Sequence, residues 1–125
     1  MPRKHRILIV EDEAIIALNL AHAVEDVDGE VVGPVASVAE ALALLETTPV
    51  NGAVLDANLV DGAVTPLALH LLDLGVPFVV HTGTGLPPDL AARPVDLPLV
   101  MKPAQATSVV ATLMRKLDPP GGILP

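Results

Sequence analysis

Side chains suited to phosphoryl chemistry follow several short apolar runs of the sequence. An acidic pair, Glu11 and Asp12, comes directly after the first run, and Asp56 comes after a later one. Thr82 and Lys102 follow two further runs. Carboxylates that gather at one point raise each other's pKa unless a cation lies among them. An ammonium group and a hydroxyl beside such a cation can stabilise the charge of a phosphoryl group in transfer.

The cation that this set of residues predicts is Mg²⁺, which typically takes one or two protein carboxylates and leaves its other positions to water and phosphate oxygens. Asp12 and Asp56 are the predicted carboxylate ligands. Asp56 is also the predicted nucleophile, because an aspartate can attack phosphorus to form an aspartyl phosphate. Lys102 offers a mobile positive charge to the transferred group, and Thr82 offers one hydrogen bond.

The elements that must position these residues alternate between strand and helix. Ile7–Val10 is a continuous apolar run, typical of a strand that is buried on both faces of a parallel sheet. Ser37 and Glu40 have the spacing of a capping box, and Gly29 and Gly75 are predicted to end helices. The remaining strands are predicted at residues 31–32, 53–55, 78–80 and 99–101. The helices are predicted at residues 14–27, 38–46, 66–74 and 106–117, with a short or irregular fourth helix at 89–92 and a loop at 61–62.

Repeated β-α units predict an α/β fold with three layers, in which helices cover both faces of an open parallel sheet. Ligands of such a sheet bind beyond the carboxyl ends of its strands. The acidic pair, Asp56, Thr82 and Lys102 all lie at predicted strand ends, so we expect them to meet at one edge of the sheet.

Composition limits the function further. A chain of 125 residues without cysteine, with 51% hydrophobic residues and Phe78 as its one aromatic residue, predicts a single cytoplasmic domain. Its apolar runs are too short to cross a membrane. A net charge of −8 disfavours nucleic acid as a partner. His5, His22, His70 and His81 lack a metal-ligand spacing, and strand alternation points His81 away from the face of Thr82.

Together these residues resemble the receiver domain of two-component response regulators, over a core of about residues 6–117 with a flexible tail at 118–125. The resemblance implies a doubly wound, flavodoxin-like sheet with the strand order 2-1-3-4-5. It also implies a site in which each residue has a role. Asp56 is the implied phosphoacceptor. Mg²⁺ is implied to bind Asp12, Asp56 and the backbone carbonyl of Asn58, and to bind Glu11 through water. The phosphate is implied to contact Thr82, Lys102 and the backbone of Gly83, and Pro103 to follow a cis peptide bond.

A narrower resemblance is to the FAT GUY subgroup of single-domain receivers, because residues 80–85, Val-His-Thr-Gly-Thr-Gly, are similar to part of its signature. This resemblance implies a histidine kinase of the HWE type as a partner. The sequence departs from many receivers at Leu99, where they place the aromatic residue of the switch.

The sequence therefore predicts a phosphorylation-controlled signalling domain that acts on protein partners or serves as a phosphate sink, and that catalyses at most its own phosphorylation and dephosphorylation. Its phosphodonor would be a histidine kinase or a phosphotransfer protein. A monomer and a phosphorylation-dependent dimer are both open. The alternatives are a docking module without phosphate turnover and a receiver cut from a longer response regulator.

Overall fold

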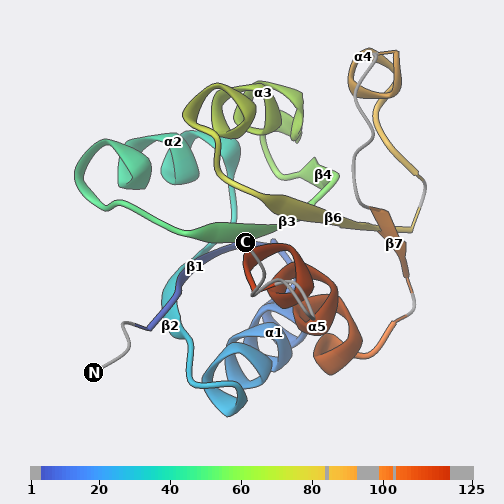
Figure 1. The fold of residues 1–125 in the computed structure, drawn as a ribbon. Coiled ribbons are helices and arrows are strands. Elements are labelled where there is room, and N and C mark those ends of the chain that lie inside the picture. Colours follow the sequence, from blue (N-terminus) through green and yellow to red (C-terminus); the bar gives the residue numbers. More distant parts are fainter. Residues whose placement is uncertain (1–3, 84, 93–98, 103, 119–125) are drawn as a thin grey trace.

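A five-stranded sheet forms the middle layer of the fold (Figure 1). The computed structural model describes residues 4–83, 85–92, 99–102 and 104–118. The strands of the sheet are β1 (Arg6–Val10), β2 (Glu30–Val35), β3 (Gly52–Asp56), β6 (Phe78–Thr82) and β7 (Leu99–Met101). They lie in the order β2-β1-β3-β6-β7, and each neighbouring pair is parallel. When only these strands are counted, this is the predicted order 2-1-3-4-5.

Helices cover both faces of the sheet, as predicted. Figure 1 shows α1 (Ala14–Asp26) and α5 (Ala106–Leu117) on one face, with α2 (Val38–Thr47) and α3 (Thr65–Leu74) on the other. The fourth helix, α4 (Pro88–Ala91), is a single short turn, so the prediction of a short fourth helix is confirmed. Among the described residues, no helix combines the length and the apolar character needed to cross a bilayer.

Each face of the sheet has its own hydrophobic core, because successive strand residues point in opposite directions. Leu8 of β1 and Leu55 of β3 belong to the core beneath α2 and α3. Ile7 and Val54 belong to the core beneath α1 and α5. The central strands are thus buried on both sides, which explains their unbroken apolar sequences.

A small hairpin follows β3 where the sequence predicted a loop. Its antiparallel strands are β4 (Asn58–Leu59) and β5 (Gly62–Ala63). Gly62 has a φ of 128°, a value that residues with a side chain rarely adopt. Two-residue strands are too short to show an alternating pattern, which is why the sequence did not reveal them.

The first helix, α1, ends at Asp26, before the predicted stop at Gly29. Asp28, rather than Gly29, takes the left-handed conformation, with a φ of 61°. Gly29 is needed for a different reason, because a Cβ at this position would lie 2.7 Å from Cγ1 of Val24. Gly75 ends α3 in the left-handed conformation, with a φ of 71°, as predicted.

One contact joins the two ends of the described chain. The Nε2 atom of His5, just before β1, lies 2.9 Å from Oδ2 of Asp118, just after α5. The two elements are close together because α5 packs on the sheet face to which Ile7 of β1 points. Of the predicted tail at 118–125, only Asp118 lies within the described residues.

Candidate functional site

The carboxyl edge of the sheet brings the predicted acidic residues and the lysine together. Glu11 follows β1, Asp56 ends β3 and Lys102 follows β7. Ligand oxygens of Glu11, Asp12 and Asp56 all lie within 4.8 Å of one another. The side chains of Glu11 and Asp56 are buried, whereas Asp12 is exposed at the mouth of the cluster.

Lys102 neutralises part of this negative charge. Its Nζ atom lies 3.3 Å from Oε1 of Glu11 and 3.5 Å from Oδ1 of Asp56. Burial alone would lower the pKa of Lys102, but the two carboxylates outweigh it and raise the pKa above its ordinary value. The lysine is therefore a fixed positive charge at neutral pH.

Glu11 is the member of the cluster whose ionised form the fold disfavours. Burial raises the pKa of Glu11 to about 7, against a hydrogen bond from the backbone N–H of Glu13 that lowers it. The carboxylate of Asp56 raises the pKa of Glu11 further, and the ammonium of Lys102 lowers it. Near neutral pH this buried acid thus holds a proton for part of the time, unless a second cation joins the site.

The donor set fits a hard divalent cation. Three carboxylates have ligand oxygens within 4.8 Å of one another, and one ammonium group contacts two of them, so the cluster carries more negative than positive charge when it is ionised. All the side chains offered are oxygen ligands, which Mg²⁺ prefers. Asn58 begins β4, two residues after Asp56, and its carbonyl stays a predicted ligand.

Thr82 lies at the end of β6 with its side chain buried. Its hydroxyl donates a hydrogen bond to the carbonyl of Gly85, at 3.1 Å. Its own backbone carbonyl accepts a hydrogen bond of 2.7 Å from the N–H of Lys102. Thr82 and Lys102 are thus joined through the backbone, and Gly83 follows as an exposed residue.

The hairpin after Asp56 is fixed by a contact that the sequence analysis missed. Oδ1 and Oδ2 of Asp61 accept hydrogen bonds of 2.9 Å and 3.1 Å from the N–H groups of Val38 and Ala39. These hydrogen bonds lower the pKa of Asp61. Asp61 thereby caps the N-terminus of α2 together with Ser37, whose hydroxyl accepts from Glu40 N–H as predicted. No local pattern could reveal this contact, because Asp61 lies far from α2 in the sequence.

The last strands of the sheet also carry Leu99 and His81, two further positions singled out from the sequence. Leu99 begins β7 and is 39% exposed, so an aliphatic side chain occupies the position where an aromatic one was noted as missing. Pro103, predicted to follow a cis peptide bond, lies outside the described residues. His81 lies beside Asp56 in the register of β3 and β6.

Comparison with known proteins gives matches among solved structures alone. No protein-family model matches the chain, and no curated protein matches it in sequence. The solution structure of SdrG from Sphingomonas melonis Fr1 is 38% identical with a TM-score of 0.75, and the match covers 94% of this chain and 98% of SdrG.

Two response regulators show the same likeness. The response regulator PhyR from Brucella abortus is 31% identical with a TM-score of 0.75, over 92% of this chain and 48% of PhyR. A CheY-like response regulator receiver domain protein from Methanospirillum hungatei JF-1 is 30% identical with a TM-score of 0.78, over 93% of this chain and 95% of that protein. All three matches thus cover more than nine-tenths of this chain.

Proposed function

This chain belongs to the receiver domains of response regulators, and we propose that it is switched by Mg²⁺-dependent phosphorylation of Asp56. The observation that carries the proposal is the position of the Asp56 carboxylate. Its ligand oxygen lies within 4.8 Å of those of Glu11 and Asp12, and its Oδ1 lies 3.5 Å from the Lys102 ammonium, which also contacts Glu11. A carboxylate that lies close to both a cation site and a fixed positive charge is suited to attack a phosphoryl group.

The phosphodonor in this proposal is a phosphohistidine of a histidine kinase or a phosphotransfer protein. An oxygen of Asp56 forms a new bond to phosphorus while the bond between phosphorus and the histidine nitrogen breaks. The electron pair of the broken bond stays on the donor imidazole. Lys102 lies close enough to Asp56 to stabilise the phosphoryl oxygens as the transfer proceeds.

The metal site of the proposal consists of Asp12, Asp56 and the backbone carbonyl of Asn58, with Glu11 bound through water. Bound Mg²⁺ would neutralise charge on the phosphoryl oxygens. Glu11 must give up its proton to take part, since burial favours its neutral form when no metal is bound. Asp12 is exposed and leaves the mouth of the site accessible to a donor.

The switch in this proposal starts at Thr82. Its hydroxyl exchanges the carbonyl of Gly85 for an oxygen of the new phosphate, and the backbone N–H of Gly83 adds a second contact. Lys102 moves with Thr82, because a backbone hydrogen bond of 2.7 Å joins them. A phosphate can shift such an equilibrium only by its difference in interaction energy between the two states.

The output of the domain is proposed to be a change in protein contacts, or the removal of phosphate from a pathway as a sink. The domain would thus act as a cytoplasmic signalling protein, as a monomer or as a dimer that forms on phosphorylation. A kinase of the HWE type is the proposed partner class, from the resemblance of residues 80–85 to the FAT GUY signature. The net charge of −8 opposes nucleic acid binding.

One observation favours a second candidate function, a docking module without phosphate turnover. Leu99 has no aromatic ring that could rotate when the Thr82 hydroxyl moves, so the aromatic switch of many receivers is absent or replaced. In that case the pocket would bind metal, and the domain would recognise its partner regardless of phosphorylation.

An NMR amide titration tests the proposed function. Wild type, Asp56→Asn and the matched surface variant Asp73→Asn receive Mg²⁺ first and then beryllofluoride, a non-covalent mimic of the phosphoryl group. We expect wild type and Asp73→Asn to respond to beryllofluoride around Thr82 and Lys102, and Asp56→Asn to remain unchanged.

The other outcomes separate the candidates. A response to Mg²⁺ without a response to beryllofluoride would favour the docking module. A response of Asp56→Asn equal to that of the wild type would refute the assignment of Asp56.

A further inference from the structure

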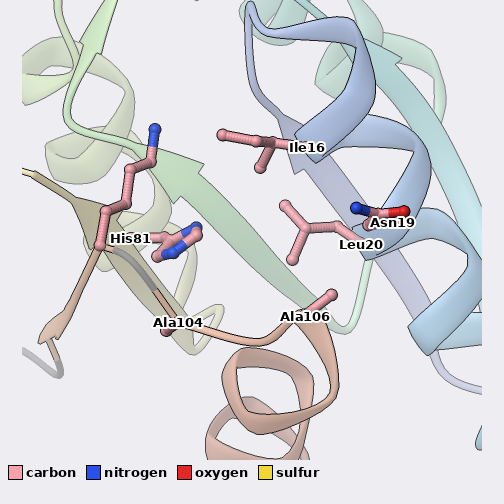
Figure 2. A pocket seen from close by; sticks show the side chains of 7 residues that line it. Ile16, Asn19, Leu20, His81, Ala104 and Ala106 are labelled. Atoms are coloured by element: carbon pink, nitrogen blue, oxygen red, sulfur yellow. The ribbon is translucent and has the colours of Figure 1, made fainter.

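A cavity of about 240 Å³ lies between α1 and the start of α5, on the sheet face opposite α2 and α3 (Figure 2). Its walls come from α1, the end of β6, and the segment that leads into α5. The residues that line it are Ile16, Asn19, Leu20, His81, Lys102, Ala104 and Ala106. Most of this surface is apolar, with the imidazole of His81 as its buried polar group.

His81 points into this cavity. Figure 2 shows its ring directed into the space between Leu20 of α1 and Ala106 of α5. The residue is 3% exposed, and neither Nδ1 nor Nε2 has a hydrogen-bond partner among the described residues. Leaving buried polar atoms unpaired costs free energy, so such groups are normally satisfied by protein, water or ligand.

The surrounding charges select against a charged occupant. Lys102 is one of the lining residues, and its positive charge opposes a cation. An anion gains little from Lys102, because its ammonium is already paired with the carboxylates of Glu11 and Asp56 at 3.3 Å and 3.5 Å. Burial, and then the charge of Lys102, lower the pKa of His81, so its ring offers one donor and one acceptor at neutral pH.

The size of the cavity limits the occupant further. An apolar protein cavity of about 150 Å³ binds benzene, so about 240 Å³ suits a molecule with roughly eight to ten non-hydrogen atoms. Apolar walls with a few polar groups that fix the orientation are typical of small-molecule sites.

We propose that this cavity binds a small, uncharged, mainly apolar molecule that forms a hydrogen bond with the imidazole of His81. The bound molecule packs against the side chains of Ile16 and Leu20 and against Lys102. Because Lys102 also contacts Asp56, the occupant biases the position of the lysine and thereby the affinity of the phosphoacceptor site. This last step rests on the proposed function, whereas the binding itself does not.

The probe for the experiment is 2-phenylethanol, which has an aromatic body and one hydroxyl group. Phenylacetate and 2-phenylethylammonium serve as probes of similar shape with a negative and a positive charge. Each is titrated into the isotope-labelled chain without Mg²⁺, while NMR follows the methyl groups of Ile16 and Leu20 and the ring of His81. We expect saturable shifts at these groups with 2-phenylethanol, and at least about tenfold weaker binding of both charged probes.

Three variants test the position of the site. His81→Leu keeps an apolar side chain but removes the hydrogen bond, and we expect it to weaken 2-phenylethanol binding by about tenfold. Ala106→Leu places extra atoms in the cavity and should abolish binding. Ser108→Leu, on the same first turn of α5 but outside the cavity wall, is the control that should bind like the wild type.

The experiments separate the binding of the small molecule from its coupling to Asp56. Absence of saturable shifts in the wild type, or equal affinity in His81→Leu, would overturn the binding site. A second titration measures beryllofluoride affinity with and without saturating 2-phenylethanol. An unchanged affinity would overturn the coupling to Asp56 alone, and a failure of beryllofluoride to bind at all would count against the proposed function while leaving the cavity result intact.

Discussion

Lys102 reaches across a strand of the sheet to place its ammonium group 3.5 Å from Oδ1 of Asp56. Asp56 ends β3 and Lys102 follows β7, and β6 lies between these two strands. The contact therefore depends on the length of the lysine side chain and on the backbone hydrogen bond that ties Lys102 to Thr82 of β6.

The first prediction concerns this contact. Lys102→Gln should lower the affinity for beryllofluoride in the presence of Mg²⁺ by at least about tenfold, because a charge-assisted interaction with the phosphoryl mimic is lost. Lys116→Gln removes an exposed lysine of α5 and should leave the affinity unchanged. Titration followed by NMR gives both values, and equal affinity in wild type and Lys102→Gln would contradict the role of the lysine.

The second prediction concerns the pH dependence of metal binding. Glu11 has a pKa of about 7 in the metal-free fold, so below this pH a proton must leave before the cluster is fully ionised. Mg²⁺ affinity should therefore rise between about pH 6 and pH 8 and then level off. Calorimetric titration at several pH values measures this rise, and Glu11→Gln should show a flatter profile.

The same group predicts a change in stability. The pKa of Glu11 is raised on folding, so the native state holds a proton that the unfolded state releases above its ordinary pKa of 4.5. In the presence of a chelator, the contribution of Glu11 to stability is thus retained below pH 4.5 and lost as the pH rises toward 7. Urea unfolding across this range should show the loss in wild type but not in Glu11→Gln.

The third prediction concerns Asp61, whose pKa is lowered by hydrogen bonds from Val38 and Ala39. A lowered pKa stabilises the fold above the unfolded pKa, and this contribution is lost as the pH falls through the folded one. Asp61→Ala should therefore unfold at lower temperature than wild type at pH 7, and the difference should shrink in acid. Asp73→Asn, on the exposed side of α3, is the control. A difference independent of pH would contradict the charged cap.

The fourth prediction concerns the packing of α5 on β3. A Cβ at Gly52 would lie 3.3 Å from both Cδ atoms of Leu113, which is fully buried. Gly52→Ala should therefore cost about 1–3 kcal/mol of unfolding free energy. In a Leu113→Ala background the same substitution should cost less, since the added methyl group meets a vacated space. A double-mutant cycle by urea unfolding measures this difference, and additive costs would show that the crowding is absent.

The parallel sheet and the cluster at its carboxyl edge could be predicted from the sequence, because the same apolar pattern recurs in several strands. Apolar runs such as Ile7–Val10 predicted buried parallel strands, and parallel strands align their carboxyl ends. The cluster of Glu11, Asp12, Asp56 and Lys102 follows from that alignment, so it was predictable without coordinates.

Features that depend on single long-range contacts were not predictable. The hairpin after Asp56 is too short to show a period, and the contact of Asp61 with α2 joins segments without a local signal. The cavity at His81 was missed because alternation predicts which face a residue points to, but not whether neighbouring helices fill the space there. Gly29 was predicted to follow the end of the first helix, but the close packing of its position on Val24, which explains the glycine, has no local signal in the sequence.

The contact between His5 and Asp118 has a consequence for protein engineering. The Nε2 atom of His5, before β1, lies 2.9 Å from Oδ2 of Asp118, after α5. The connection between α2 and β3, around the exposed Pro49, then becomes a place to open a circularly permuted chain whose original ends are joined by a linker. In such a permutant β3 and Asp56 would come first in the chain, while the sheet order and the acidic cluster would stay the same. The geometry of the site is thus a property of which strands lie side by side, and not of the order in which they are synthesised.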